Sequence, residues 1–427
     1  MSNTSTSTLK LPITNVYSKS DYTVTLFIGS EQTPVNLLID SGSSTLAIAE
    51  KNYQAKNDTY LVPTTVAQEV IYGLGGWNGP LVNTSISIGE NQKITLQSSH
   101  IALVEDNHQW QTFGDTDGIL GLAYHHLNKS FDLASYFEKE KLTPALTYPW
   151  IFTDDHQHNS NQLRAFKKFL WQYPEHDVKP YFTELEEKGL VANKFAFYSK
   201  RSSVHVATNK NSISNTAKQE QLLQDPLNHG YLILGGGEEF NELYQGKFKE
   251  VPVLHDVYYN VELDSVTVAN SPTFIAAPLD KKHLKGYQSN AIIDTGSSVL
   301  VLTADIYQYV IEAFGKNNSK FEQLLAPFND IDAQHKGISG ENLNLNEWPD
   351  IIFTFKTNKG VENLTCSPET YWQLNFPEYG KACFKIISQL PHWPNQSILG
   401  LPLINNYYVV FDRAKNKTGV IKFAKQK

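Results

Sequence analysis

The sequence predicts an all-β protein of two lobes with a few short helices. At 427 residues the chain is longer than a single hydrophobic core usually supports, so two lobes are expected. Its apolar residues come in short segments broken by Gly, Pro, Asn and Asp, which is typical of short strands rather than long helices. A third observation, one phrase that occurs twice, places one copy in each half of the chain.

The repeated phrase reads Leu-Leu-Ile-Asp-Ser-Gly-Ser-Ser at 37–44 and Ala-Ile-Ile-Asp-Thr-Gly-Ser-Ser at 291–298. Each apolar run predicts a buried strand, and each Gly-Ser-Ser predicts a tight loop, so Asp40 and Asp294 lie at the mouths of core strands. If the two loops face each other, carboxylates that close cannot both ionise, and the pair holds one proton across acidic pH. The ionised carboxylate can then accept a proton as a base, while the protonated one donates a proton as an acid. This is the chemistry that adds water to an amide.

Composition excludes several other classes of function. The net charge of −8, the pI near 5.9 and the lack of basic runs give no reason to expect a nucleic-acid partner. No apolar stretch approaches the roughly 20 residues of a membrane helix, so no membrane partner is expected. The acidic and histidine residues of 154–158 match no strong zinc spacing and predict a solvated loop. We therefore expect no metal and no organic cofactor.

The amino terminus and the cysteines bear on the cellular location. The first residues are polar and lack the basic and apolar regions of a signal peptide. Cys366 and Cys383 are the two cysteines, fewer than a secreted chain of this size usually carries, and they can be either free or paired. We expect a cytoplasmic protein, with a secreted or vacuolar location as the alternative if the chain is a trimmed mature form.

Taken together, the motifs resemble those of the pepsin-like aspartic endopeptidases. The matches in this chain run from about residue 20 to the carboxyl terminus, and they follow the order in which that family carries them. Besides the two Asp loops, the matching segments are Asp-Gly-Ile-Leu-Gly-Leu-Ala-Tyr at 117–124, Ser-Ile-Leu-Gly at 397–400 and Tyr-Tyr-Val-Val-Phe-Asp-Arg at 407–413. The resemblance implies the bilobal acid protease fold with a central cleft. It further implies that Ile119-Leu120-Gly121 and Ile398-Leu399-Gly400 each pass beside the Asp loop of their own lobe.

The resemblance also implies a role for each residue of the two Asp loops. It assigns catalysis to Asp40 and Asp294, cross-bracing of the loops to Ser41 and Thr295, hydrogen bonds to the outer carboxylate oxygens to Ser43 and Ser297, and amides facing the dyad to Gly42 and Gly296. Of these, Gly42, Gly296 and Ser297 are also expected to contact the substrate.

A glycine-dense stretch at 71–79 lies between β-like segments and predicts a mobile hairpin tip. By resemblance this hairpin is the flap that closes over a peptide, with Tyr72 as its tyrosine. Most relatives steady that tyrosine with a tryptophan seven residues after the first Asp, but this chain has Ala47 there. Trp77 is a plausible replacement, as in a β-secretase-like subgroup, and the alternative is an ordinary packed aromatic residue. Trp110 and Phe113 match the lining of the substrate subsites, with a core role as the equal alternative.

Two stretches exceed what compact relatives need. We expect 125–178, which contains several aromatic residues, to fold and border the cleft, and 203–228 to form a flexible surface loop. Pro180–Gly189 predicts a helix, and Ala304–Phe314 predicts a second, capped by Thr303 and stopped by Gly315. The lobe boundary then falls near 200, giving an N-terminal lobe of 1–200 and a C-terminal lobe of 201–427.

These patterns predict an aspartic endopeptidase that hydrolyses peptide bonds at acidic pH and prefers apolar residues around the cut. Its expected partners are peptide or protein substrates and pepstatin-type inhibitors, and the chain is expected to be a monomer. Only 39 residues precede Asp40, so the protein resembles the prosegment-free bacterial members of the family. The alternative is a catalytically silent peptide-binding or inhibitor protein on the same fold.

Overall fold

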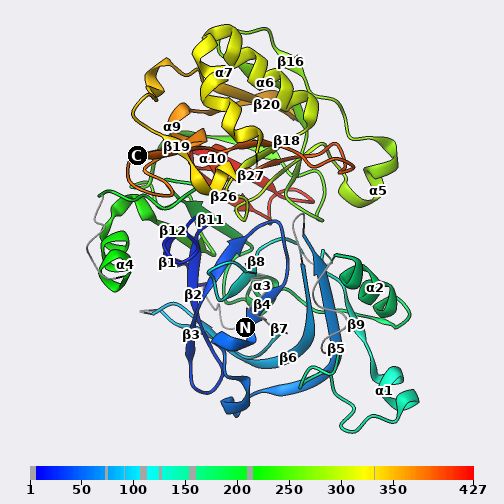
Figure 1. Ribbon diagram of the computed structural model, residues 1–427. Helices are drawn as coiled ribbons and strands as arrows, with labels where there is room; N and C mark the ends of the chain where they lie inside the picture. The colour runs from blue at the N-terminus through cyan, green and yellow to red at the C-terminus, as the bar shows by residue number, and fades with distance from the viewer. Residues whose placement is uncertain are drawn as a thin grey trace. The chain divides into compact units, whose positions relative to one another are not determined.

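The computed structural model describes residues 6–72, 76–90, 92–105, 113–124, 127–152, 160–208, 215–330 and 332–427. Strands outweigh helices, 38% against 22%, which confirms the predicted mainly β, pepsin-like class. The chain divides into two compact units (Figure 1): one contains Met1–Leu9 and Thr23–Val191, and the other contains Lys10–Tyr22 and Ala192–Lys427.

The first unit is a strongly curved sheet. Its strands are β2 (Thr23–Ile28), β3 (Thr33–Asp40), β4 (Leu46–Ala49), β5 (Val62–Ile71), β6 (Gly76–Ile88), β7 (Ile94–Val104), β8 (Gly118–Gly121), β9 (Ser130–Asp132) and β10 (Glu175–His176). They run in the spatial order β10-β9-β5-β6-β7-β4-β8-β3-β2, and β2 also pairs with β6. This extra pairing closes the strands from β6 round to β2 into a ring. Its helices are η1 (Glu50–Asn52), η2 (Ala55–Asn57), α1 (Ala134–Glu140), α2 (Ser160–Leu170) and α3 (Tyr181–Glu187).

Two apolar clusters fill this unit. One lies between the β5–β6 hairpin and strands β4, β7 and β8 and contains, besides aliphatic side chains, Ala47, Trp77 and Phe113. The other joins Ala67 of β5 to aromatic and aliphatic side chains of the stretch 125–178, Phe166 among them. The described part of that stretch is therefore folded, as predicted, because its aromatic residues have a common core to bury against.

The second unit contains several sheets. Its strands are β1 (Leu9–Thr14), β11 (Lys194–Tyr198), β12 (His229–Leu234), β13 (Tyr244–Pro252), β14 (Asn260–Val261), β15 (Leu263–Val268), β16 (Phe274–Ile275), β17 (Ala291–Ile293), β18 (Leu300–Leu302), β19 (Ile338–Ser339), β20 (Ile351–Thr357), β21 (Gly360–Cys366), β22 (Trp372–Leu374), β23 (Lys381–Phe384), β24 (Ile386–Ser388), β25 (Ser397–Leu399), β26 (Tyr407–Asp412) and β27 (Val420–Gln426). The spatial orders are β1-β12-β11-β26-β27-β13, β14-β17-β25-β18-β24, β16-β15-β20-β21 and β19-β23-β22.

The helices of the second unit are α4 (Asn215–Gln224), η3 (Pro226–Asn228), η4 (Lys281–His283), α5 (Leu284–Tyr287), α6 (Ala304–Asn317), α7 (Ser319–Leu325), η5 (Ala326–Asn329), α8 (Ala333–Lys336), η6 (Leu345–Glu347), α9 (Pro368–Tyr371) and α10 (Leu401–Ile404). An aromatic core packs beneath α6 and α7, where Phe321 stacks on Trp348 with ring centroids 3.9 Å apart.

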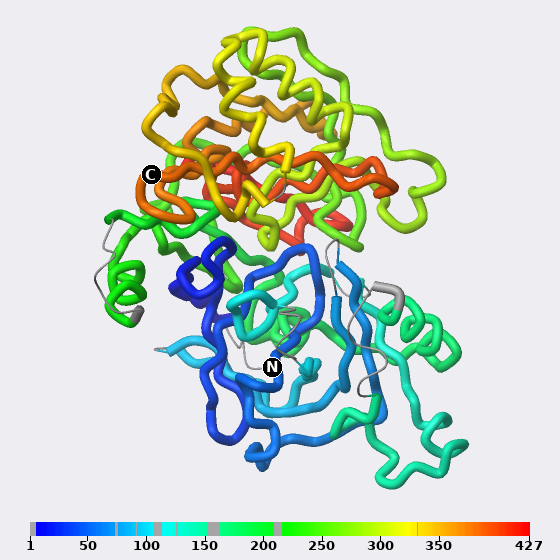
Figure 2. Tube along the Cα trace, viewed as in Figure 1, coloured from blue at the N-terminus to red at the C-terminus, as the bar shows by residue number. Residues whose placement is uncertain are grey.

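The segment 10–22 belongs to the second unit, whereas the predicted division placed all of 1–200 in the first lobe. The reason is strand pairing, because β1 lies beside β12 (Figure 2), and Asn15 N donates to Asn228 O at 3.2 Å. The boundary between the units lies after Val191, just before β11 begins.

Two local predictions need correction. Helix α6 does not stop at Gly315 but continues to Asn317. Helix α7 folds back against α6 at this point, and a Cβ on Gly315 would lie 2.4 Å from Glu322 Oε1. The glycine therefore makes room for α7 and does not end the helix. The stretch 203–228 contains helix α4, followed by η3, which Asp225 caps by accepting a hydrogen bond from Leu227 N at 3.0 Å. The helix predicted at Pro180–Gly189 is confirmed as α3.

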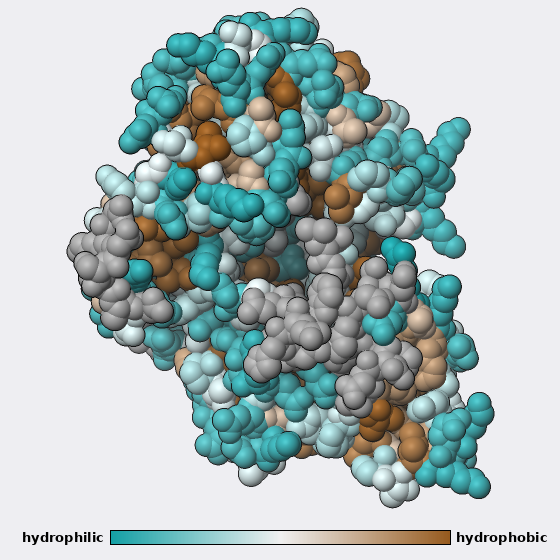
Figure 3. All heavy atoms as spheres, in the orientation of Figure 1, coloured by the Kyte–Doolittle hydropathy of each residue, from teal (hydrophilic) through white to brown (hydrophobic). Residues whose placement is uncertain are grey.

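Both cysteines are free and buried, so the described structure has them unpaired. Hydrophilic residues cover most of the visible face in Figure 3, as expected for a mean hydropathy of −0.36. No helix among the described residues combines the length and apolarity needed to span a membrane. The candidate metal-ligand loop 154–158 lies outside the described residues.

Candidate active site

Asp40 is the last residue of β3, a strand enclosed between two neighbours in the first unit. β3 pairs with β2 on one side and runs parallel to β8 on the other, which sets Asp40 opposite Gly121. The carboxylate is 8% exposed, and its Oδ1 accepts a hydrogen bond of 2.7 Å from the backbone N–H of Gly42. Strand geometry therefore delivers the acid to the end of the core, and the turn after it donates to one of its oxygens.

The Asp40 loop is hydrogen-bonded through its backbone to the segment that contains Gly121. Gly121 N donates to Thr45 O at 3.0 Å, and Ala123 N donates to Ser43 O at 2.8 Å. A Cβ on Gly121 would lie 2.5 Å from Thr45 N, closer than any real side chain allows. Only glycine permits this approach, as the apolar-apolar-Gly pattern predicted.

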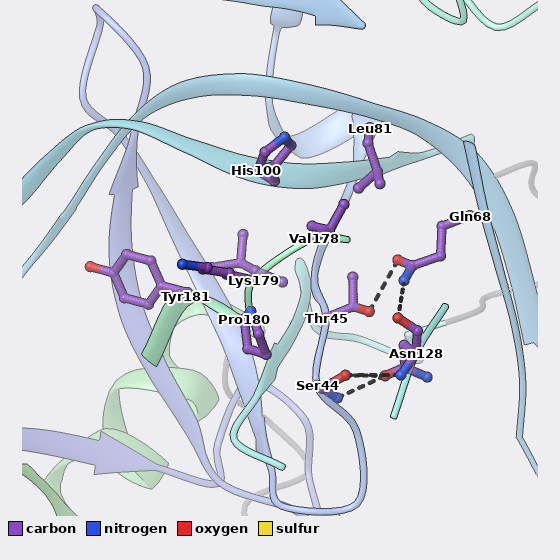
Figure 4. Close-up of a pocket in the computed structure, with 11 residues that line it drawn as sticks. Ser44, Thr45, Gln68, Leu81, His100, Asn128, Val178, Lys179, Pro180 and Tyr181 are labelled. Carbon is purple, nitrogen blue, oxygen red and sulfur yellow. Dashed lines mark hydrogen bonds between the residues drawn. The ribbon is translucent and has the colours of Figure 1, made fainter. Parts of the chain in front are cut away.

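A second hydrogen-bond network fixes Ser44 and Thr45, the last residues of the same loop (Figure 4). Ser44 N donates to Asn128 Oδ1 at 2.7 Å, and Gln68 Nε2 donates to Asn128 O at 3.1 Å. Thr45 Oγ1 in turn donates to Gln68 Oε1 at 3.0 Å. Gln68 belongs to β5, so the network connects the Asp40 loop directly to the hairpin.

The second unit contains a closely similar arrangement around Asp294. The acid follows β17, which runs parallel to β25, and Asp294 N donates to Leu399 O at 3.1 Å. Its Oδ1 accepts a hydrogen bond of 2.9 Å from Gly296 N. A Cβ on Gly400 would lie 2.2 Å from Ser297 O, so glycine is required at this approach too.

The two loops therefore share the same construction, each within its own unit. In both, a short core strand ends at an aspartate, the amide two residues later donates to Oδ1, and a parallel Ile-Leu-Gly strand passes beside the turn. This local geometry follows from the duplicated phrase, because Asp-Ser-Gly-Ser-Ser and Asp-Thr-Gly-Ser-Ser differ only in one hydroxyl residue and favour the same turn chemistry.

The hydroxyl groups of the two loops differ from the expectation at two positions. Ser43 Oγ is buried without a hydrogen-bond partner among the described residues, and Ser297 Oγ donates to Val299 O at 2.9 Å. The bonds expected from these hydroxyls to the carboxylates are therefore not formed, since the loop backbone turns Ser297 toward its own chain. Ser41 and Thr295, the residues directly after the acids, are fully buried.

Tyr72 lies at the end of β5 and is tied to the other strand of the hairpin. Trp77 Nε1 donates a hydrogen bond of 2.9 Å to the Tyr72 hydroxyl, the contact that a replacement for the missing tryptophan requires. Ala47 lies in the same apolar cluster as Trp77, where its small side chain leaves room for the indole. Burial and, to a smaller extent, the charge of Asp40 raise the pKa of Tyr72, so its phenol stays neutral.

The remaining predicted subsite residues divide into two groups. Phe113 is 7% exposed and belongs to the apolar cluster that contains Trp77, so it has the core position that the sequence left open. Trp110 and the hairpin tip at 73–75 lie outside the described residues. Sequence reasoning missed Gln68 and Asn128, because a lone amide side chain carries no motif that would reveal contacts across 60 residues.

Comparisons with known proteins identify the family of the chain. The family model described as eukaryotic aspartyl protease matches residues 21–143 and 179–425. Similar curated proteins include a beta-secretase of Strongylocentrotus purpuratus, 21% identical over 422 residues, and pepsin A of Gallus gallus, 24% identical over 422 residues. The alignments cover 93% of this chain and 65% of the first relative, and 96% of this chain and 86% of the second. A vacuolar aspartic protease of Candida albicans is 21% identical over 429 residues, covering 96% of this chain and 76% of that protein.

Proposed function

Since the chain belongs to the eukaryotic aspartyl protease family, a family of peptide hydrolases, we propose that it is an aspartic endopeptidase whose catalytic pair is Asp40 and Asp294. The ionised acid takes a proton from a water molecule, and the protonated acid donates to the carbonyl oxygen of the scissile amide. In the second step the acid that gained the proton donates it to the leaving amine nitrogen, and the other acid takes a proton back from the gem-diol intermediate. The C–N bond then breaks, and the pair returns to its starting protonation state. No covalent intermediate with the protein is formed in this reaction.

One observation carries the proposal: the same carboxylate geometry is built twice. Gly42 N and Gly296 N donate to one oxygen of Asp40 and Asp294 at 2.7 and 2.9 Å. A hydrogen bond from a backbone N–H to a carboxylate oxygen stabilises the charged form of the acid. Two unrelated turns would have no reason to repeat this arrangement together with the parallel Ile-Leu-Gly strand.

The substrate is proposed to be an extended peptide covered by the β5–β6 hairpin. Tyr72 presents a neutral, oriented phenol, and the apolar cluster behind it supports a preference for apolar side chains around the cut. Gly42 and Gly296 lack side chains beside the carboxylates, so a peptide backbone can approach closely. Ser41 and Thr295 are proposed to brace the two loops through their buried hydroxyls.

The function is tested by digesting a denatured protein mixture from about pH 3 to about pH 7, with and without pepstatin. Asp40→Asn and Asp294→Asn keep the size of each side chain and remove its ionisable group. Asp256→Asn is the matched control, because that side chain is 63% exposed on the second unit. Circular dichroism confirms that each variant is folded, and sequencing of the fragments reports the residues around each cut.

Pepstatin-sensitive cleavage at acidic pH that disappears in both active-site variants and persists in Asp256→Asn supports the proposal. A folded wild-type chain that binds peptides but cuts none at any pH would contradict it and favour the peptide-binding alternative. Activity that survives Asp294→Asn would exclude a two-carboxylate mechanism.

A location outside the cytoplasm is proposed together with this function. The name of the Candida albicans relative, a vacuolar aspartic protease, supports a vacuolar location over the cytoplasmic one expected from the sequence. An acidic compartment also suits a reaction that needs one protonated carboxyl. A monomer is proposed, and size-exclusion chromatography with light scattering would measure its mass directly.

A further inference from the structure

Strand β5 has one side facing the Asp40 loop and the other facing helix α2. Val66 and Val70 pack in the cluster that contains Trp77, and Gln68, between them, bonds to the Asp40 loop. The alternate residues point the other way, since side chains of a strand alternate between its faces. Among these, Ala67 packs against the second cluster and Glu69 pairs with α2. The hairpin is therefore covered on the side that does not face the catalytic loop.

Helix α2 contacts the hairpin through apolar side chains. Leu163, Phe166 and Leu170 are buried, at spacings that place them on one face of the helix. A Cβ on Gly76, the first residue of β6, would lie 3.1 Å from Leu163 Cδ1, so the leucine reaches the strand that returns from the hairpin tip. Figure 1 shows α2 alongside β5.

A charge pair adds to this contact. Lys167 Nζ lies 3.3 Å from Glu69 Oε2, and the Glu69 side chain is 2% exposed while the lysine is 37% exposed. Glu69 Oε1 is buried without a hydrogen-bond partner among the described residues. Burial raises the pKa of Glu69, and the Lys167 ammonium acts in the opposite direction. The lysine is therefore the charge that compensates an acid buried in the hairpin.

The segment that carries α2 lies outside the part of the chain that the family model matches. The family model matches 21–143 and resumes at 179, so α2 at Ser160–Leu170 lies in the unmatched interval. β5 and β6 lie inside the matched part. A helix outside the matched part thus packs on a hairpin inside it.

We propose that helix α2 supports the β5–β6 hairpin as a brace and that Lys167 is a positioning residue. The ion pair between Lys167 and Glu69 fixes the position of strand β5. The position of β5 in turn sets the orientation of Tyr72 relative to the substrate. The proposal rests on the proposed function, because it assigns the hairpin to substrate binding. Lys167 acts through Glu69 and β5 and does not itself contact the peptide.

The pair predicts a distinctive pattern among variants. Lys167→Met leaves the buried Glu69 carboxylate without its counter-charge, so the hairpin moves to expose the acid to water. Adding Glu69→Gln removes that charge and partly restores the hairpin, whereas Lys167→Arg keeps the pairing. Lys168→Met is the matched control, since Lys168 is the exposed neighbour on the same helix.

The first measurement is the kinetics of peptide cleavage at the highest pH that supports activity, where Glu69 is most ionised. Because the hairpin contacts the peptide before and during reaction, Lys167→Met is expected to raise KM about threefold or more with a smaller change in kcat. Lys167→Arg and Lys168→Met are expected to keep the wild-type KM, and Lys167→Met/Glu69→Gln to lie between. Thermal unfolding of each variant shows that the assays are made well below the melting temperature.

The second measurement does not need activity. Amide hydrogen exchange at neutral pH, followed in peptides that cover β5 and β6, reports local opening of the hairpin. Lys167→Met is expected to exchange faster there than Lys168→Met, with no difference in β26 and β27 of the second unit.

Equal KM values and equal rates of amide hydrogen exchange in β5 and β6 for Lys167→Met and Lys168→Met would contradict the proposal that α2 is a brace. A lower melting temperature with unchanged KM and exchange would reduce the pair to a purely structural contact and also reject the proposal. If the wild-type chain fails to cleave peptides, the proposed function fails, while the exchange comparison still decides whether α2 holds the hairpin.

Discussion

The indole of Trp77 and the phenol of Tyr72 are joined by a hydrogen bond of 2.9 Å inside one hairpin. The tyrosine is therefore oriented by the strand that returns from the hairpin tip, while the position on β4 holds Ala47. Both aromatic rings belong to one hairpin, so the hydrogen-bond support for Tyr72 comes from within that hairpin.

Trp77→Phe keeps an aromatic ring and removes the N–H donor. Loss of one neutral hydrogen bond is expected to lower kcat/KM about two- to tenfold, because Tyr72 is no longer held in one orientation. Tyr72→Phe removes the acceptor, and the double variant is expected to lose little more than either single one. The measurement is steady-state kinetics with one peptide substrate. Trp171→Phe is the control, since Trp171 is 61% exposed.

Gly121→Ala is expected to destabilise the first unit and to displace the Asp40 loop. A Cβ there would lie 2.5 Å from Thr45 N and 2.7 Å from Ser43 O, so backbone must move. Such overpacking lowers the free energy of unfolding by about 2 kcal/mol or more. Gly286→Ala is the control, because a Cβ on Gly286 meets nothing within 4 Å. Equal midpoints of the two variants in urea would show that the loop can yield.

Lys385 is buried in the second unit, and burial lowers its pKa to about 8 from 10.5. Between those pH values the unfolded chain binds more protons than the folded one, so this group makes the free energy of unfolding rise with pH, by about 3 kcal/mol in total. Below pH 8 both states are protonated and the full destabilisation remains. Lys385→Met is therefore expected to stabilise the chain at neutral pH.

The difference in unfolding free energy between Lys385→Met and wild type isolates this group from the tyrosines that titrate in the same range. That difference should shrink as the pH is raised from 8 toward 10.5. Lys381→Met, at the start of the strand β23 that precedes Lys385, is the control for loss of one positive charge. A constant difference across this range would mean that Lys385 keeps its ordinary pKa in the folded chain.

The two thiols are expected to be unreactive in the folded protein. Burial raises the pKa of Cys366 to about 12 and that of Cys383 to about 11, so neither forms the thiolate that attacks disulfide reagents. Cys366 Sγ donates to Pro402 O at 3.3 Å, and Cys383 Sγ donates to Gln334 O at 3.4 Å. A colorimetric thiol assay should detect no thiol in the native chain and two after denaturation. None after denaturation would indicate a disulfide.

The local sequence was sufficient to predict the parts of the site whose structure depends on turn chemistry. The strand, the aspartate and the glycine amide at Asp40 and Asp294 formed as expected, and so did helix α3, with Pro180 before it and Gly189 after it. The Trp77 contact could also be anticipated, because its partner is only five residues away in the same hairpin.

Other features depended on segments that are distant along the chain. Gly315 ends no helix because Glu322 of α7 packs over it, and residues 10–22 join the second unit because β1 finds β12. The stretch 125–178 was expected to fold, but the position of its helix α2 on β5 could not be read from an amphipathic pattern. A pattern shows which face of an element is apolar, whereas the partner that buries that face is selected by the packing of the whole unit.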